Sequence, residues 1–208
     1  MSAVLPASKR NGLILAVLVL LGLAILVPIN LYTREIIIKR EEEEKMGVIE
    51  QILPKELYDN RLLRDSVKVP PDLQLLHMRN RHVAYRARLN GKPSAVIFET
   101  MAPDGYSGNI YLILAVREDG TVTGVRVLSH NETPGLGDYI EIAKNNWIKM
   151  FGGTSLRSHN DSAWEVRKDG GRFDYVTRAT LSARAIVRAT HRALRYFQIH
   201  KNELFRDT

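Results

Sequence analysis

Three polar segments of the chain carry the residue types that could take part in chemistry. They are Asp104–Gly108 (DGYSG), Glu132–Asp138 (ETPGLGD) and Thr177–Ser182 (TRATLS). Glycine lets the backbone approach a flat ligand closely, but it also supplies the positive φ of ordinary turns. The hydroxyl groups of the third segment could cap a following helix, or they could lie where a helix N-terminus binds phosphate. Spacing alone favours ordinary turns for the two glycine-rich segments, and the residue types leave both alternatives open for the third.

Composition and spacing argue against several other kinds of site. The chain has no cysteine, which excludes a disulfide framework, a thiolate zinc site and a cysteine-ligated iron–sulfur cluster. Its six histidines include no HExxH pattern, so we expect hydrogen-bonded loop histidines and no metal site. Gly105–Gly108 lacks the spacing of a serine hydrolase elbow. Ile140 stands where a dinucleotide fingerprint beginning at Gly135 would need its third glycine.

The net charge is +7, from 30 lysines and arginines against 23 acidic residues. Much of the excess lies in the last third of the chain, and an acidic block, Glu41–Glu44, lies near the other end. No zinc-finger spacing, RNP-type motif or basic heptad region accompanies the arginines, so we predict no nucleic-acid binding. A basic helix could also face anionic lipid, but such arginines more often form a solvated face.

The N-terminal region predicts a membrane anchor. Leu13–Ile29 is a run of seventeen residues without a charged side chain. A helix over residues 12–32 would be about 31 Å long, enough for a hydrocarbon core of ~30 Å. A cleaved signal peptide usually has a shorter apolar region, and residues 28–33 offer no small-x-small cleavage site. We therefore predict a retained transmembrane helix over 12–32 after a short cytoplasmic tail, 1–11, although the mixed charges that flank the span leave its orientation ambiguous.

Period-two alternation and turn residues predict two β-hairpins. The expected strands are His82–Leu89 with Ala95–Glu99, and Ile110–Arg117 with Thr121–Leu128. Asn90-Gly91, in a loop slightly longer than two residues, and Asp119-Gly120 are typical hairpin turns. On the first strand, alternation predicts one face with Val83, Tyr85 and Ala87 and an opposite face with Arg86 and Arg88.

Helical periodicity is clearest at the C-terminal end. The positions spaced i, i+3, i+4 and i+7 are Ala183, Ile186, Val187, Thr190, Ala193, Leu194 and Phe197, with Arg184, Arg188 and Arg195 opposite. We also predict a helix over Glu35–Leu57, a break at Val69–Asp72, a helix over Asp138–Met150 and an edge strand and turn within Asn160–Gly171. The expected fold is α+β: a juxtamembrane helical linker, 33–68, followed by a domain of antiparallel β-hairpins packed with helices, 69–208.

Three stretches resemble a known family. DGYSGNIYLILAV, VRVLSHNETPGLGD and FDYVTRATLSARAIV follow one another in this order. They resemble the RnfG/RsxG family, the G subunit of the Rnf electron-transport complex, which is related to the FMN-bearing C subunit of the sodium-pumping NADH:quinone reductase. ETPGLGD is a specific signature at its position, and the resemblance runs from the N-terminal span through most of the domain.

The resemblance implies an FMN attached covalently, through its phosphate, to a threonine in an S/T-G-A-T-x-S/T motif. The accepting residue would be Thr180, with Thr177, Ala179 and Ser182 at other motif positions and Arg178 in place of the glycine. Arg178 could hinder recognition by the flavin transferase that attaches the group, or it could pair with the phosphodiester. Near the flavin ring the resemblance implies Glu132, Thr133, Leu136 and Gly137, with Gly105, Tyr106 and Ser107 in another part of the pocket.

The same resemblance implies the function. The chain would be an electron-transfer subunit of a membrane-bound, ion-translocating ferredoxin:NAD oxidoreductase complex. Its main domain would be periplasmic, on a single pass through the bacterial inner membrane with the N-terminus cytoplasmic. The flavin would carry the redox chemistry, so no side chain need act as a nucleophile or base, and the isolated subunit would turn over no substrate. The alternative is a membrane-tethered periplasmic scaffold or binding module without covalent flavin. The implied partners are the other membrane and peripheral subunits.

Overall fold

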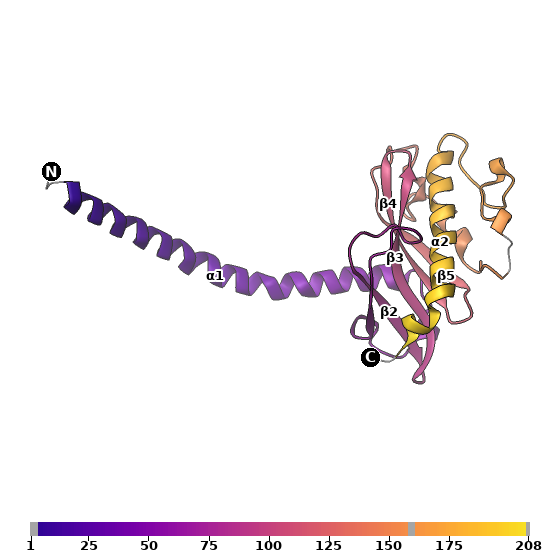
Figure 1. The fold of residues 1–208 in the computed structure, drawn as a ribbon, viewed down its shortest axis with the longest axis horizontal. Helices are drawn as coiled ribbons and strands as arrows, with labels where there is room; N and C mark the ends of the chain where they lie inside the picture. Colours follow the sequence, from indigo (N-terminus) through magenta and orange to yellow (C-terminus); the bar gives the residue numbers. More distant parts are fainter. Residues whose placement is uncertain (1–3, 158–160, 207–208) are drawn as a thin grey trace. The chain divides into compact units, whose positions relative to one another are not determined.

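The computed structural model describes residues 4–157 and 161–206. The chain divides into two compact units, Met1–Lys45 and Met46–Thr208. Helix α1 (Val4–Glu50) is continuous and contains Pro28 (Figure 1). In the described part of the chain, one helix is long and apolar enough to cross a membrane, with a window of mean hydropathy 3.0. Its large apolar side chains between Leu13 and Ile29 are exposed, as expected of a helix that faces lipid.

The structure differs from the expected division between linker and domain. Ile49, Ile52, Leu53 and Leu62 are almost fully buried, so the second compact unit begins at Met46 and not at residue 69. The helix also ends earlier than predicted, at Glu50 and not at Leu57. Pro54 has no N–H for a helical hydrogen bond and disfavours helical geometry at the residue before it, which explains the early end.

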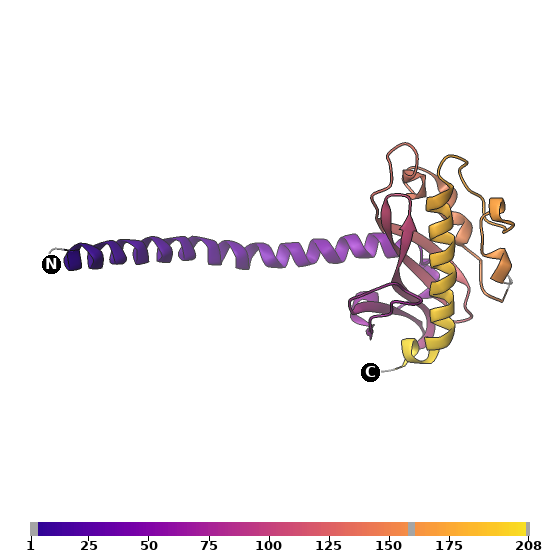
Figure 2. The ribbon, with the colours of Figure 1, turned by 45° about the horizontal axis from the view of Figure 1, so that its top comes forward.

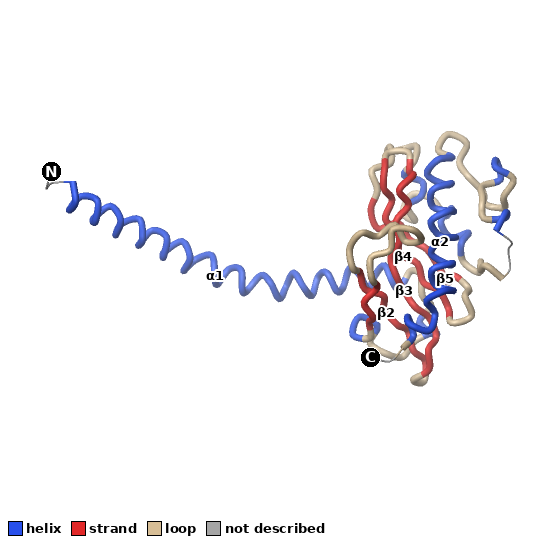
Figure 3. The backbone as a smooth tube through the Cα atoms, in the orientation of Figure 1, coloured by secondary structure: helices blue, strands red, loops and turns tan. Residues whose placement is uncertain are grey.

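In the part of the chain that the structure describes, five antiparallel strands form one sheet in sequence order, and Figure 3 shows strands in red. They are β1 (Ser66–Val69), β2 (His82–Leu89), β3 (Lys92–Gly105), β4 (Gly108–Arg117) and β5 (Val122–Ser129). The two predicted hairpins are confirmed. Strand β1 was not predicted, because residues 66–68 were assigned to the helical linker and Val69 to the break that follows it. The loop between β2 and β3 is also shorter than predicted, because Leu89 pairs with Lys92. Its two residues, Asn90 and Gly91, both have positive φ, as a type I′ turn requires.

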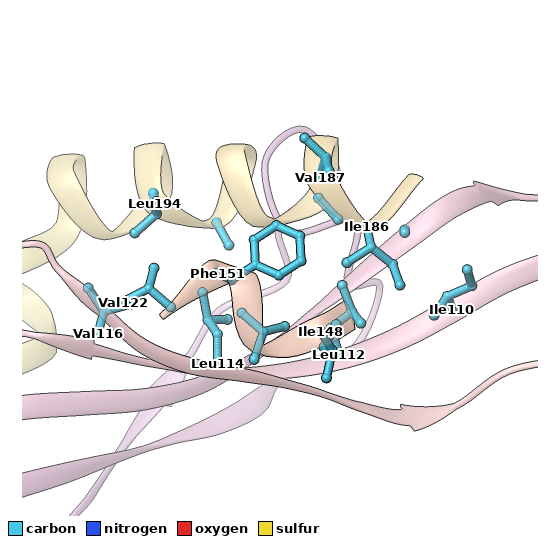
Figure 4. Packing of buried hydrophobic residues seen from close by; sticks show 14 of the residues in the cluster. Ile110, Leu112, Leu114, Val116, Val122, Ile148, Phe151, Ile186, Val187 and Leu194 are labelled. Atoms are coloured by element: carbon cyan, nitrogen blue, oxygen red, sulfur yellow. The ribbon is translucent and has the colours of Figure 1, made fainter. Parts of the chain in front are cut away.

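Apolar side chains on both faces of the sheet are buried, which produces two cores. Helix α2 (Thr180–Phe205) lies along one face, as Figures 1 and 2 both show. Between α2 and the strands, Figure 4 shows Ile148 and Phe151 from the 3-10 segment η4 (Asn146–Phe151), packed near Leu112 and Leu114. The second core, on Ile97 and Ala115, is covered by residues 46–63. The α+β fold is therefore confirmed.

The predicted apolar face of α2 is confirmed, since all seven of its residues are buried. Its basic side does more than contact water. Arg184 pairs with Asp169 at 2.6 Å, Arg188 pairs with Glu165 at 3.1 Å, and Arg195 is exposed. These ion pairs hold the segment that follows residue 160 against the helix.

Strand β2 departs from the predicted alternation. Val83 is exposed, whereas Arg86 is 5% exposed. The Arg86 guanidinium donates to Asp65 at 2.5 Å, and a register shift lies between Ala87 and Arg88. A carboxylate partner makes burial of the cation tolerable, and that partner cannot be recognised from the alternation of β2 alone.

Two predictions for the segment between β5 and α2 are wrong. Asp138–Met150 forms no α-helix but parts of two 3-10 segments, η3 (Asp138–Ile140) and η4. Asn145 has extended backbone geometry between them, and its side chain accepts a hydrogen bond from the Trp147 N–H. The expected edge strand is replaced by η5 (Asp161–Ala163), η6 (Arg167–Asp169) and one bridge between Val166 and Phe173. Asn160 lies outside the described residues.

Candidate functional site

The three polar segments meet at one end of the sheet. Tyr106 and Ser107 form the two-residue turn between β3 and β4, because Gly105 pairs with Gly108. The loop that begins at His130 leaves β5 where Ser129 pairs with Tyr111, near the start of β4. The start of α2 lies at the same end of the molecule as the β3–β4 turn (Figures 1 and 2). Antiparallel pairing thus brings together segments that are far apart in the sequence.

These segments surround a cavity of about 420 Å³. Its lining residues are Tyr106, Glu132, Thr133, Leu136, Gly137, Thr177, Arg178, Ala179, Thr180, Leu181 and Ser182. Of the site residues that the resemblance implied, Gly105 and Ser107 do not line the cavity, although the Ser107 N–H donates to Glu132. Leu181 also lines the cavity but was not predicted as a site residue, although it lies between two predicted site residues, Thr180 and Ser182. The volume lies within the range of ~300–1,000 Å³ usual for small-molecule sites.

Glu132 connects the walls of this cavity. Its side chain is buried, with 4% of the residue exposed. Oε1 accepts a hydrogen bond of 3.0 Å from the Ser107 N–H in the β3–β4 turn. Oε2 accepts one of 2.5 Å from the Ser182 hydroxyl in the first turn of α2. One carboxylate therefore contacts two segments that lie 25 and 50 residues away in the sequence.

Two glycines leave room for the Glu132 side chain. A Cβ at Gly137 would lie 2.8 Å from the Cβ and Oε2 of Glu132. A Cβ at Gly105 would lie 2.8 Å from Oε1 of Glu132 and 2.4 Å from the Gly108 carbonyl oxygen. The close approach that glycine permits is thus made by a carboxylate of the protein. Gly135 has a φ of +74°, so this glycine allows an ordinary turn, the other interpretation of the segment.

Two aromatic side chains fix the segment that leads into α2. The Tyr139 hydroxyl donates to the Ala179 carbonyl at 3.1 Å, and the Trp147 indole donates to the Asp174 carbonyl at 2.7 Å. Burial, together with the nearby negative charge of Glu132, raises the pKa of Tyr139 to about 12. Tyr139 therefore remains a neutral hydrogen-bond donor at physiological pH. Neither Tyr139 nor Trp147 was among the predicted site residues.

The start of α2 is open to an anion. Thr180 is the first helical residue, and the N-cap residue, Ala179, makes no side-chain cap hydrogen bond. The Thr180 hydroxyl reaches the Thr177 carbonyl only at 3.5 Å, which is a weak contact. The two alternatives for this segment were a helix cap and a phosphate site. Among the described residues, no side chain caps the start of α2. The N–H groups of a helix N-terminus carry partial positive charge and attract phosphate.

His130 supports the loop through hydrogen bonds. Its Nδ1 accepts from the Glu132 N–H at 2.9 Å, and its Nε2 lies 2.8 Å from Oε1 of Glu141. Among residues 4–157 and 161–206, no group of three or more histidine, aspartate or glutamate side chains could hold a metal ion.

The residues present fit an FMN. Leu136 and Leu181 offer apolar surface for a flat ring, and both are about half exposed at the cavity. The open N-terminus of α2 and the exposed Arg178 offer positive charge for a phosphate. Thr177, Thr180 and Ser182 place three hydroxyl groups in the same lining.

This fold and site define a cofactor-binding α+β domain that follows a helix able to span a membrane. Residues 105–195 match the FMN-binding domain family. The chain is 42% identical to the G subunit of the ion-translocating oxidoreductase complex of Shewanella oneidensis, across 94% of this chain and 92% of that protein. It is 43% identical to the corresponding protein of Pseudomonas aeruginosa, across 94% and 91%. The chain therefore belongs to the family of G subunits of ion-translocating oxidoreductase complexes.

One solved structure is also similar. The crystal structure of Shewanella oneidensis NqrC is 26% identical, covers 72% of each chain and superposes with a TM-score of 0.49.

Proposed function

We propose that this protein is the electron-transfer subunit of an ion-translocating ferredoxin:NAD oxidoreductase complex and that it carries electrons on an FMN. Family membership supports a role in such a complex, and the match of residues 105–195 to the FMN-binding domain family supports the cofactor. The bound FMN supplies the redox chemistry, whereas the chain supplies binding, orientation and electrostatics. The isolated subunit turns over no substrate under this proposal.

The attachment site in this proposal is Thr180, through an ester between its hydroxyl and the FMN phosphate. The observation that carries the assignment is the position of this hydroxyl. It lies in the cavity lining, at the first residue of α2, and it does not cap the helix. A phosphate held there would be stabilised by the helix N-terminus. A flavin transferase would make the ester from a flavin dinucleotide: the hydroxyl oxygen would bond to the flavin-side phosphorus as the phosphoanhydride bond breaks, with the nucleoside monophosphate as leaving group and the hydroxyl proton lost.

Arg178 stands where the family motif has glycine. Its position favours pairing with the phosphodiester over hindrance of the flavin transferase. Its side chain is exposed and lines the same cavity as Thr180. A guanidinium can form strong charge-assisted hydrogen bonds to a phosphodiester. We therefore propose that Arg178 binds the phosphate of the attached FMN.

The membrane arrangement is a further part of the proposal. Residues 12–32 would cross the bacterial inner membrane as a single pass, with residues 1–11 cytoplasmic and the second compact unit periplasmic. The apolar run of α1 supports the span. The flavin domain would then contact the other membrane and peripheral subunits of the complex from the periplasmic side. The alternative function is a scaffold or binding module of the same complex without covalent flavin.

Denaturing electrophoresis tests the attachment directly. The full chain, purified in detergent from its own host, should give a band with flavin fluorescence, because a covalent adduct survives denaturation. Trypsin cleaves after Arg172, Arg178 and Arg184, so it separates Thr177 on peptide 173–178 from Thr180 on peptide 179–184. Mass spectrometry should find the adduct on the second peptide, with fragmentation assigning it to Thr180 and not to Ser182.

Two matched variants complete this experiment. Thr180→Val removes only a hydroxyl, so it should abolish the fluorescent band and leave the fold intact. Thr177→Val removes the other threonine hydroxyl of the segment Thr177–Ser182 and should keep the fluorescence. Fluorescence retained by Thr180→Val would contradict the assignment, and a dark wild-type band with an unmodified peptide 179–184 would favour the scaffold.

A further inference from the structure

Glu132 is unusual among the acidic residues of the domain because it is buried within the candidate site. In the described part of the chain it makes no ion pair, whereas Asp65, also shielded from solvent, pairs with Arg86 and Arg88. Burying a carboxylate is costly unless its oxygens are hydrogen-bonded or paired. The hydrogen bonds from Ser107 and Ser182 offset that cost, and the N-terminus of α2 adds partial positive charge beside Oε2.

The surroundings of Glu132 fix its position from several sides. The His130 Nδ1 accepts a hydrogen bond from the Glu132 N–H, and the other ring nitrogen of His130 is hydrogen-bonded to Glu141. Gly105 and Gly137 leave no room for a Cβ without displacing the carboxylate. The two oxygens bond to two different elements, the β3–β4 turn and α2. Loss of the carboxylate would therefore free three walls of the cavity from one another and leave the Ser107 N–H and the buried Ser182 hydroxyl without this acceptor.

We propose that Glu132 has two roles toward an FMN held in this cavity, an inference that rests on the proposed function. It is a positioning residue that joins the β3–β4 turn, the loop after β5 and the first turn of α2. Its fixed negative charge also lowers the midpoint potential of the bound flavin. A group that gains electrons beside a buried anion is disfavoured, because little water screens the repulsion there.

Two substitutions separate these roles in the full chain, purified in detergent with its flavin. Glu132→Gln removes the charge but keeps an oxygen that can accept from the Ser107 N–H and an N–H₂ group that can donate to the Ser182 hydroxyl. Glu132→Ala removes the charge and both hydrogen bonds. Glu118→Gln is the control. Glu118 lies in the β4–β5 turn, its side chain is 54% exposed, and its carboxylate pairs with Lys201 of α2, outside the cavity lining.

The measurements are a spectroelectrochemical titration of the flavin and a thermal unfolding curve. Glu132→Gln should shift the midpoint potential to a more positive value, and the shift should persist at high salt, with little change in Tm. Glu132→Ala should lower Tm markedly, and Glu118→Gln should change neither quantity. A potential for Glu132→Gln equal to that of Glu118→Gln would overturn the electrostatic role. An unchanged Tm for Glu132→Ala would overturn the positioning role.

The unfolding comparison is repeated in the Thr180→Val background, which should lack flavin. Glu132→Ala should lower Tm there as well, because the hydrogen bonds to Ser107 and Ser182 do not involve the cofactor. A wild-type protein without flavin would overturn the proposed function, and with it the role of Glu132 in the potential. The Tm comparison still decides the positioning role, so the two failures are distinguishable.

Discussion

At the scale of single residues, the candidate site depends on a small number of residues whose contacts cannot be read from local sequence patterns. Thr180 has a hydroxyl that does not cap its helix, and Glu132 has both oxygens bonded to other elements. Position 137 requires glycine because a Cβ there would collide with the Glu132 side chain. The backbone is not the reason, since its φ of −86° is open to any residue. Arg178 stands two residues before Thr180, where the motif of the family that the sequence resembles has glycine.

Arg178→Gly tests whether the cation binds the flavin phosphate. It restores the glycine of the family motif, so covalent attachment should be retained. Loss of a positive charge beside the phosphodiester should shift the flavin midpoint potential to a more negative value, because the reduced group is then less stabilised. Arg195→Gly is the matched control, because Arg195 is an exposed arginine of α2 outside the cavity lining. A titration identical to that of the wild type would argue against phosphate binding.

At the scale of elements, the second compact unit depends on close packing between the end of α1 and the sheet. Thr123 of β5 donates its hydroxyl to the Ile52 carbonyl at 2.5 Å, and Arg126 donates to the Gln51 carbonyl at 2.9 Å. These donors satisfy carbonyl groups in the chain just after the helix end. Gly124, between them in sequence, lies directly under Ile52. The segment 46–53 is therefore an integral part of the domain and not a linker.

Gly124→Ala should destabilise the domain by about 1–3 kcal/mol, because overpacking a well-packed contact forces the backbone to shift. The added Cβ would lie 2.9 Å from the Ile52 Cα. Gly47→Ala is the matched control, since a Cβ at Gly47 in α1 meets nothing within 4 Å. That change should be neutral or stabilise by roughly 0.5–1 kcal/mol, the usual preference for alanine over glycine in a helix. Urea unfolding of the full chain in detergent measures both; equal stabilities would show that the contact is not tight.

At the scale of the whole molecule, one chain combines a helix that can span a membrane with a domain that has its own two cores. The two relatives described above share one name, and this chain covers more than nine-tenths of their length. A covalently held FMN would suit such a protein, because a tethered flavin acts as a fixed relay and does not diffuse away.

Reporter fusions after Thr208 test the proposed orientation. A reporter that is active only outside the cytoplasm, such as alkaline phosphatase, should be active, and a reporter that fluoresces only in the cytoplasm should be dark. Deletion of residues 12–32 should reverse both signals, because it removes the proposed signal anchor. A bright cytoplasmic reporter on the intact chain would place the flavin domain on the other side of the membrane.

Local sequence patterns determined much of the fold. The apolar run predicted a helix long enough to span a membrane, the Asn90-Gly91 and Asp119-Gly120 turns predicted their hairpins, and the 3.6-residue period predicted the buried face of α2. These features depend on residues close in sequence, where turn chemistry and periodicity act. The candidate site residues came from a family resemblance, which also rests on short stretches read in order.

Only the tertiary structure decided which distant residues meet. The burial of Arg86 depends on Asp65, 21 residues away, and the junction at Glu132 depends on Ser107 and Ser182, 25 and 50 residues away. The apolar residues of 138–150 favour a helix, but in the structure the 3-10 turns bury Ile140, Trp147 and Ile148 in the core and leave Ala143 exposed. Sequence patterns report local preference, whereas contacts across the fold determine which preference is satisfied and which polar groups can be buried together.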